Sequence, residues 1–236
     1  MNKEIQLVKL RTNDSIYVFK NDSISNYVNT SKNYYEEKKV LGVLKSILDL
    51  ELVIYDIGAN IGNHSLYFSR EIKAKKIYSF EPVSFIFNVL QKNAQFVNNI
   101  TAFNFGLGSL EQKIQAIPRI WIDDKTSQNI VNYGSYSADN VGTEFADTTL
   151  ELETAHIKVL DNLVFEEKSI LPPQFIKIDV EGYELEVLKG AKKTIKTYKP
   201  VIFLESFAEK YKEVHNFLNS LGYVKKADFP EENYLY

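Results

Sequence analysis

Residues 53–69 read VIYDIGANIGNHSLYFS, and this stretch divides into three parts that together predict the fold. The first part, residues 53–57, is largely apolar and rich in residues that favour a buried strand. The loop that follows contains Gly58, Asn60 and Gly62, and glycine permits backbone conformations and close approaches that other residues do not. After the loop, apolar residues recur at helical spacing, which predicts a helix whose unpaired N–H groups could face a ligand.

Length and composition describe a globular chain of one domain, residues 1–236, with 44% hydrophobic and 25% charged residues. The formal net charge of −3 shows no basic footprint for nucleic acid. The chain has no cysteine, which excludes disulfides, thiolate metal ligands and a cysteine nucleophile. No stretch reaches the ~18 apolar residues of a membrane span, and the N-terminus is charged, so we expect a cytoplasmic protein without such a span.

Strand and helix patterns alternate along most of the chain. Strands are predicted at 52–57, 76–80, 101–105, 173–179 and 200–205, and helices at 62–72, from the capping residue Ser84 onward, 183–197 and 209–221. The N-terminal extension, residues 1–50, contains a β-like run at 15–19 and a predicted helix at about 34–48. Residues 223–226 and 233–236 predict a closing hairpin. This alternation implies an α/β fold with a mostly parallel sheet and helices on both faces.

Residues 109–157 interrupt the alternation. The segment is polar and irregular in pattern, and it is too long for a simple connection. We therefore expect an insertion with some structure of its own, which binds an acceptor substrate or acts as a lid. Tyr133, Tyr136 and Phe145 could stack on a sugar ring there, or could anchor the segment.

Four carboxylates stand where predicted strands end, and ligands of such sheets bind at that edge. They are Asp56, Glu81, Asp179 and Glu205. Glu81 lies 23 residues after Gly58, close to the spacing of roughly 20 residues at which an acid binds ribose hydroxyls. Interaction with a helix dipole is the alternative for Glu81, and a turn-forming role is the alternative for Asp56. Carboxylates repel a pyrophosphate, so the cationic S-adenosylmethionine suits this edge better than a dinucleotide.

A second dense stretch, IKIDVEGYE at 176–184, completes a set of separated motifs. With DIGANIGNHS at 56–65, FEP at 80–82 and FLE at 203–205, the chain resembles the FkbM family of methyltransferases over about 50–205. The resemblance implies a Rossmann-like class I methyltransferase fold with a mostly parallel seven-stranded sheet and a C-terminal hairpin. It also implies S-adenosylmethionine as cofactor and, usually, a hydroxyl as acceptor.

The resemblance also assigns the cofactor site. The residues carried over, with their sequence neighbours, are Asp56, Gly58, Asn60, Gly62, Asn63, Glu81, Pro82, Gly106, Leu107 and Asp179. The glycine loop would hold the methionine end, and Glu81 would bind the ribose. Gly106 and Leu107 would border the adenine. Asp179 would face the amino end of the cofactor or the acceptor.

A hydroxyl acceptor must lose a proton, which a general base or a metal ion promotes. The candidate catalytic residues are Asp179, Glu181, Glu205 and His64. The acids could instead hold a divalent ion through oxygen ligands, although the sequence does not favour this. Glu181 and Glu184 could equally stabilise the start of a helix, and His64 could be a helix-packing residue.

Two acceptor classes and two other protein classes agree with these motifs. Family association favours a sugar or glycan hydroxyl, and a small-molecule natural product or a lipid is the alternative. Two other classes share the strand, loop and ribose acid: an NAD-dependent oxidoreductase and a non-catalytic cofactor-binding module. Tyr34 and Lys38 form a Tyr-x-x-x-Lys pair, but it precedes the glycine loop, the wrong order for short-chain dehydrogenases.

Overall fold

The structure of the protein is a computed structural model that describes residues 4–20, 22–34, 52–123, 128–137, 153–230 and 232–236. The predicted helix at 34–48 lies outside these residues except for Tyr34. Phe145 also lies outside them, and the side chains of Tyr133 and Tyr136 are not described. Among the helices of the described ranges, none combines the length and apolar character that crossing a bilayer requires.

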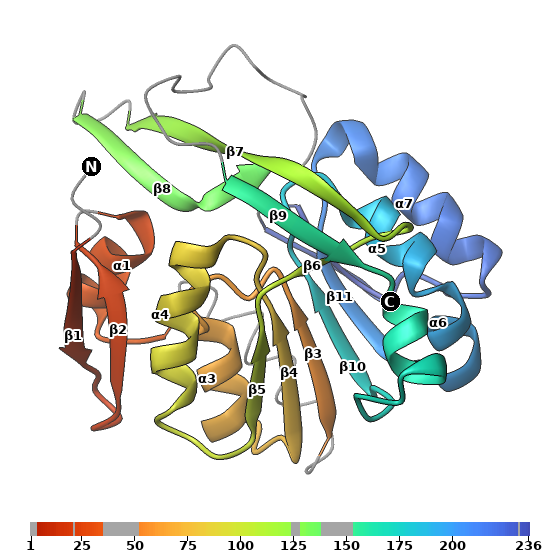
Figure 1. Ribbon diagram of the computed structural model, residues 1–236. Helices are drawn as coiled ribbons and strands as arrows, with labels where there is room; N and C mark the ends of the chain where they lie inside the picture. Colours follow the sequence, from red (N-terminus) through yellow and green to blue (C-terminus); the bar gives the residue numbers. More distant parts are fainter. Residues whose placement is uncertain (1–3, 21, 35–51, 124–127, 138–152, 231) are drawn as a thin grey trace.

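A seven-stranded sheet forms the centre of the molecule (Figure 1). Its order is β12-β13-β11-β10-β3-β4-β5. The strands are β3 (Val53–Ile57), β4 (Lys76–Phe80), β5 (Ile100–Phe103), β10 (Phe175–Ile178), β11 (Val201–Glu205), β12 (Ala227–Phe229) and β13 (Asn233–Leu235). The five strands from β11 to β5 are parallel, and only β13 and β12 run antiparallel to their neighbours. This confirms the predicted sheet and its C-terminal hairpin, although the hairpin begins at Ala227 and not at residue 223.

Helices cover both faces of this sheet (Figure 1). They are α3 (Asn63–Arg70) and α4 (Ser84–Ala94) on one face, and α5 (Glu184–Gly190), α6 (Lys192–Tyr198) and α7 (Ala208–Ser220) on the other. Alternate residues of β3 show the two layers. Tyr55 packs in a cluster with Val187 of α5 and Val214 of α7, whereas Ile54 packs with Phe68 of α3. The helices lie on opposite faces because the crossovers are right-handed and run in opposite directions across the sheet. The chain moves one way from β3 to β4 and β5, and the other way from β10 to β11.

Two helix predictions differ from the structure. The helix expected at 183–197 is divided at Ala191, whose φ of −104° and ψ of 6° leave the helical region. Just before this break, Gly190 lies so close to the backbone of Gly108 that a Cβ would be 1.9 Å from its carbonyl oxygen. Ser84 does not cap α4 with its side chain, because Val83 occupies the N-cap position. The N–H of Val83 donates a hydrogen bond of 2.9 Å to a carboxylate oxygen of Glu81.

The N-terminal extension packs on the α3 and α4 layer. It contains the antiparallel strands β1 (Ile5–Lys9) and β2 (Ser15–Phe19), followed by α1 (Ser23–Ser31). Val28 of α1 and Ile16 of β2 share a buried cluster with Leu66 of α3. Arg70 at the end of α3 forms an ion pair of 2.8 Å with Asp14. The extension thus shares a buried cluster with the helix layer that covers one face of the central sheet.

The segment 109–157, for which we expected some structure of its own, contains β7 (Gln112–Asp123), β8 (Gln128–Ser137) and most of β9 (Glu153–Lys158). With β6 (Gly106–Leu107), which precedes the segment, they form a second sheet in the order β6-β9-β7-β8. The polar, irregular sequence pattern did not indicate these strands, because backbone pairing between distant segments does not require an apolar pattern. A π-helix, Asn162–Glu166, follows β9.

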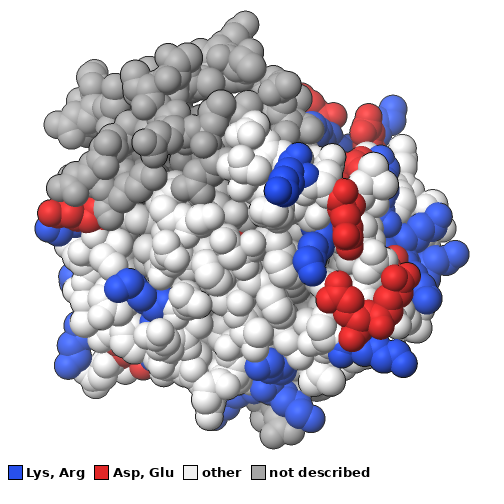
Figure 2. Space-filling view, in the orientation of Figure 1, with Lys and Arg blue, Asp and Glu red and all other residues white. Residues whose placement is uncertain are grey.

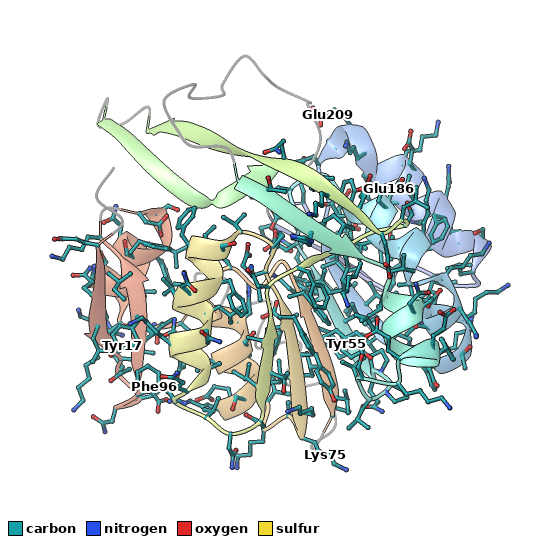
Figure 3. The ribbon with its side chains drawn as sticks, in the orientation of Figure 1. Tyr17, Tyr55, Lys75, Phe96, Glu186 and Glu209 are labelled. Atoms are coloured by element: carbon teal, nitrogen blue, oxygen red, sulfur yellow. The ribbon has the colours of Figure 1, made fainter. Side chains whose placement is uncertain are left out.

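This second sheet lies across one edge of the central sheet (Figure 1). Lys75, just before β4, lies at the opposite end of the molecule from Glu209 in the first turn of α7 (Figure 3). The parallel strands thus begin near Lys75 and end beneath β7 and β9. The carboxyl edge, where such sheets bind ligands, therefore lies beneath the insertion.

Candidate functional site

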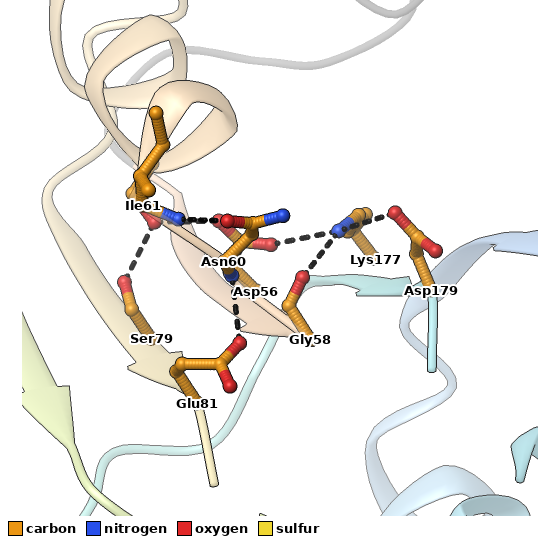
Figure 4. Close-up of polar contacts among 9 residues, drawn as sticks. Asp56, Gly58, Asn60, Ile61, Ser79, Glu81, Lys177 and Asp179 are labelled. Atoms are coloured by element: carbon orange, nitrogen blue, oxygen red, sulfur yellow. Dashed lines mark hydrogen bonds and ion pairs between the residues drawn. The ribbon is translucent and has the colours of Figure 1, made fainter. Parts of the chain in front are cut away.

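A buried lysine lies at the centre of the carboxyl edge (Figure 4). Lys177 pairs in register with Asp56, because β10 and β3 are neighbours. Its side chain is 2% exposed, and its Nζ lies 3.4 Å from Asp56 Oδ1 and 3.1 Å from Asp179 Oδ2. Nζ also donates a hydrogen bond of 2.9 Å to the carbonyl oxygen of Gly58. One cation therefore joins the ends of two strands.

Asp56 points into the protein and is fully buried. Its Oδ2 accepts a hydrogen bond of 2.5 Å from Ser65 Oγ, which lies 2.7 Å from Ser79 Oγ. Burial raises the pKa of Asp56, while the charge of Lys177 and the bond from Ser65 oppose this. Burial acts to lower the pKa of Lys177, but the carboxylates of Asp179 and Asp56 outweigh it, so that pKa is raised and the ammonium stays charged.

The glycine loop between β3 and α3 has three residues with positive φ: Gly58 at 75°, Asn60 at 49° and Gly62 at 84°. A Cβ on Gly58 would lie 1.7 Å from the carbonyl oxygen of Asp179, and one on Gly62 would lie 2.6 Å from Leu90 Cδ1. Packing against backbone therefore requires glycine at residue 58, whereas at residue 62, where the contact is with the end of a side chain, the positive φ is the main reason for glycine. Ligand approach, the reason offered by the sequence, is not needed to explain them.

Glu81 lies at the end of β4 beside this loop. Its Oε2 accepts a hydrogen bond of 3.0 Å from the N–H of Asn60, and its Oε1 accepts the one from Val83. The side chain is 6% exposed, and burial raises its pKa to about 7 although both hydrogen bonds act to lower it. The contact with Val83 matches the helix-start alternative, and the contact with Asn60 joins Glu81 to the glycine loop. Each oxygen keeps a further acceptor position.

The predicted adenine edge lies next to this acid in the fold. Gly106 and Leu107 form β6 and are buried. A Cβ on Gly106 would lie 3.4 Å from the Cβ of Pro82 and 2.8 Å from Ile157 Cδ1. The structure thus brings together two predicted positions, Gly106 and Pro82, that are 24 residues apart in the sequence.

The candidate catalytic acids lie around the turn that follows β10. Asp179 has a side chain that is 26% exposed, and the register of Ile178 with Leu204 places it beside Glu205. Glu181 and Gly182 have positive φ values of 54° and 100°. Asp179, Glu181 and Glu205 are all partly exposed, so they border the surface where Asp56 does not.

His64 and Asn63 occupy the first turn of α3 and are buried. The ring of His64 stacks on Phe68 with centroids 6.1 Å apart. Burial and the charge of Lys177 hold the pKa of His64 well below its usual range, so the ring stays neutral. These contacts agree with the interpretation of His64 as a helix-packing residue. Among the described residues, no three His, Asp or Glu side chains gather as a metal-binding group, so the divalent-ion alternative gains no support.

Sequence reasoning missed the buried charge of Lys177, and it named Glu184 only as a possible helix-start acid without its burial. Lys177 stands between Ile176 and Ile178 in a strand that both faces bury, and a lysine there needs counter-charges; that signal could have identified it. Glu184 is 2% exposed, and its Oε1 accepts a hydrogen bond of 2.8 Å from the N–H of Gly182. Burial raises the pKa of Glu184 to about 7.

Two buried side-chain oxygens at the carboxyl edge, Glu184 Oε2 and Ser206 Oγ, make no hydrogen bond within the described structure, and a third, Asp56 Oδ1, has only its ion pair of 3.4 Å with Lys177. Asp56 is the next-to-last residue of β3, Glu184 begins the helix after β10, and Ser206 directly follows β11. Buried polar atoms normally have a partner. Their concentration at one edge marks this region as the candidate functional site.

Curated methyltransferases are similar in sequence to this chain. The hexuronic acid methyltransferase AglP of Haloferax volcanii is 28% identical over 167 residues, which cover 70% of this chain and 61% of AglP. The 31-O-demethyl-FK506 methyltransferase FkbM of Streptomyces tacrolimicus is 28% identical over 156 residues, 58% of each protein. The chain thus spans about three fifths of the length of these curated relatives.

A solved structure and a family description agree with these relatives. The crystal structure of methyltransferase FkbM from Methylobacillus flagellatus has a TM-score of 0.54 at 19% identity, covering 81% of this chain and 45% of that one. This likeness shows a shared fold. Residues 56–225 match the family described as methyltransferase FkbM domain. Because that match covers well over half of the chain, the protein belongs to the FkbM family of methyltransferases.

Proposed function

We propose that this protein is an S-adenosylmethionine-dependent methyltransferase that methylates a hydroxyl group of a sugar or glycan. The observation that carries the proposal is the excess of carboxylates at the carboxyl edge. Asp56, Glu81 and Asp179 surround a single buried cation, Lys177. A ligand with positive charge suits this edge, whereas the charge of a pyrophosphate would be repelled.

The chemistry of the acidic side chains at this edge suits S-adenosylmethionine. Its sulfonium and ammonium groups would offset the uncompensated negative charge, and its ribose hydroxyls would donate to the remaining acceptor positions of Glu81. Gly58, Asn60 and Pro82 are partly exposed beside these acids, so backbone and ring atoms are available to the ligand. Asp56 is enclosed, and we assign it an indirect role through Lys177 and the loop.

The chain itself would align the acceptor and remove its proton. Bound S-adenosylmethionine supplies an electrophilic methyl group, and alignment of the two reactants accounts for much of the rate. We assign the general base to the partly exposed acids Asp179, Glu181 and Glu205, with Asp179 first because its oxygen is already oriented by Lys177. His64 is buried and is the weakest candidate of the set.

The acceptor is proposed from the relatives and from the insertion. AglP is named for a hexuronic acid, which supports a sugar acceptor. The second relative is named for a demethylated FK506, which supports a natural product as the second candidate. The sheet of β7, β8 and β9 crosses the carboxyl edge (Figure 1), which supports the proposal that the insertion contacts the acceptor. On the face shown in Figure 2, the described centre carries few charged side chains and no broad basic patch for nucleic acid.

Calorimetric titration of the full chain with S-adenosylhomocysteine and, separately, with NAD tests the cofactor assignment. We expect one S-adenosylhomocysteine to bind per chain and NAD to bind weakly or not at all. Tight binding of NAD alone would identify an oxidoreductase and overturn the proposal. Transfer of a labelled methyl group to a panel of sugars, lipids and natural products then separates an enzyme from a non-catalytic binding module.

Replacement of Asp179 with alanine tests the proposed catalytic assignment. A loss of methyl transfer that exceeds any loss of affinity for S-adenosylhomocysteine supports a role at the acceptor. Unchanged turnover would remove Asp179 from the mechanism and leave Glu181 and Glu205 as the candidates.

A further inference from the structure

Lys177 is an unusual residue for its position. It lies in β10 between Ile176 and Ile178, which are each 1% exposed, and its own side chain is 2% exposed. Taking an ammonium group out of water costs several kcal/mol unless charged and polar partners compensate it. A buried lysine in the middle of a parallel sheet therefore requires an explanation beyond packing.

We propose that Lys177 is a positioning residue that holds the glycine loop after β3 and the acidic turn after β10 in a fixed relation. This inference rests on the proposed function and deepens it, because these two segments would bind opposite sides of the same cofactor. No described contact gives Lys177 a role in removing the proton from the acceptor.

The contacts of Nζ support this role. An ammonium group has three donors, and its three partners are the Gly58 carbonyl at 2.9 Å, Asp179 Oδ2 at 3.1 Å and Asp56 Oδ1 at 3.4 Å. Gly58 belongs to the loop and Asp179 to the turn, so the ammonium bridges both segments. The same segments touch directly, since the Asp179 carbonyl occupies the space where a Cβ of Gly58 would be.

The bridge continues into the surrounding elements. From Asp56 the hydrogen bonds run to Ser65 in α3 and on to Ser79 in β4. The titratable groups that interact with Lys177 are Asp56 of β3, Asp179 of the turn, Glu81 after β4 and His64 of α3. Four neighbouring segments of the proposed cofactor site, β3, α3, the end of β4 and the turn after β10, therefore each contribute a titratable group that interacts with this one charge.

Lys177→Met removes the charge while keeping a long unbranched side chain, but it leaves Asp56 buried without its cation. The double variant Asp56→Asn/Lys177→Met removes both members of the buried pair, so most of the penalty for an uncompensated charge disappears. Lys189→Met is the matched control, because Lys189 is an exposed lysine that forms an ion pair with Glu186. Each full-length variant is titrated with S-adenosylhomocysteine, and its thermal unfolding is followed by circular dichroism.

We expect Lys177→Met to be less stable, and the double variant to regain cooperative unfolding near the wild-type midpoint. In that refolded double variant, the affinity for S-adenosylhomocysteine should stay about tenfold or more below wild type, because Gly58 and Asp179 have lost their bridge. Lys189→Met should match wild type in both measurements. Wild-type affinity in the double variant would overturn the inference, and so would failure of the double variant to fold, since Lys177 would then serve folding alone. Failure of the wild-type protein to bind the probe would instead overturn the proposed function.

Discussion

The carbonyl oxygen of Asp179 lies where Gly58 would carry a side chain, 1.7 Å from the position of a Cβ. The two residues are 121 positions apart and meet because β3 and β10 are parallel neighbours. The N–H of Asp179 donates to the carbonyl of Ile57 at 3.0 Å, which extends the pairing past the end of β10. The glycine loop and the acidic turn are therefore packed directly against each other.

This contact predicts a large penalty for Gly58→Ala. The methyl group would collide with backbone, which cannot move aside, and the residue would keep a strained φ of 75°. Strain and overpacking each cost about 1–3 kcal/mol, so we expect a loss of roughly 3 kcal/mol or more in the free energy of unfolding. Urea denaturation measures it.

Gly222→Ala is the matched control. Gly222 has a similar φ of 83°, but a Cβ there would meet only Lys199 Nζ at 3.7 Å. Its cost should be about 1 kcal/mol, from the left-handed conformation alone. Equal destabilisation at residues 58 and 222 would show that the contact with Asp179 contributes nothing.

Glu184 predicts a pH dependence of stability. Its pKa is raised by burial from 4.5 to about 7, so the folded protein retains a proton that the unfolded chain releases. The resulting stabilisation is complete below about pH 4.5 and is lost as the pH rises through about 7. Glu184→Gln stays neutral, so its unfolding free energy relative to wild type should increase by on the order of 3 kcal/mol from pH 4.5 to pH 8.

Glu186→Gln serves as the control for this change. Glu186 lies on the same helix, but it is partly exposed, and hydrogen bonds from Lys189 and Ser109 lower its pKa in spite of burial. Its substitution should have a small effect of the opposite sign, seen as slightly lower stability at pH 8. Parallel pH profiles for the two variants would contradict the burial of Glu184 as the cause.

Glu81 predicts a pH dependence of cofactor binding. Burial raises its pKa to about 7, and the ionised carboxylate is the better acceptor for ribose hydroxyls. Affinity for S-adenosylhomocysteine should therefore increase from pH 5.5 to pH 8, approaching tenfold per pH unit at the acidic end. Calorimetry in buffers of different ionisation enthalpy should also detect proton release on binding.

In Glu81→Gln the affinity should be lower and nearly constant over that pH range. Glu209→Gln, at an exposed acid in the first turn of α7, should keep the wild-type profile. If Glu81→Gln retained the full pH dependence, another group would be responsible and the ribose assignment would lose its support.

The N-terminal extension is predicted to stabilise the whole domain through Tyr34. The tyrosine is 5% exposed, donates a hydrogen bond of 2.5 Å to Asp14, and accepts one of 2.7 Å from Arg70. Tyr34→Phe leaves both charged partners less satisfied and should cost about 1–3 kcal/mol in denaturant unfolding. Tyr198→Phe, at a tyrosine that is 39% exposed and stacks on Phe165, should change stability by less than about 0.5 kcal/mol. Equal losses would show that the Tyr34 hydroxyl does not join the extension to α3.

The sequence alone determined the sheet and the position of its functional edge. Apolar runs ending in Asp56, Glu81 and Glu205 predicted parallel strands with acids at their carboxyl ends, and the structure has β3, β4 and β11 at those places. Such patterns are readable because strand and helix periodicity, turn glycines and strand-end acids depend on neighbouring residues. The family motifs can be recognised for the same reason, since each is a run of neighbouring residues.

Only the tertiary structure decided which charged residues pair with one another and where the insertion lies. Lys177 acquires its role because register places it opposite Asp56, and no local pattern encodes that pairing. The strands of the insertion depend likewise on a distant pairing, Gln112 with Ile157, and the break at Ala191 follows the contact of Gly190 with Gly108. Local sequence specifies which residues are buried and which backbone angles they prefer, whereas the partner of a buried charge or a strand is fixed only when distant segments meet.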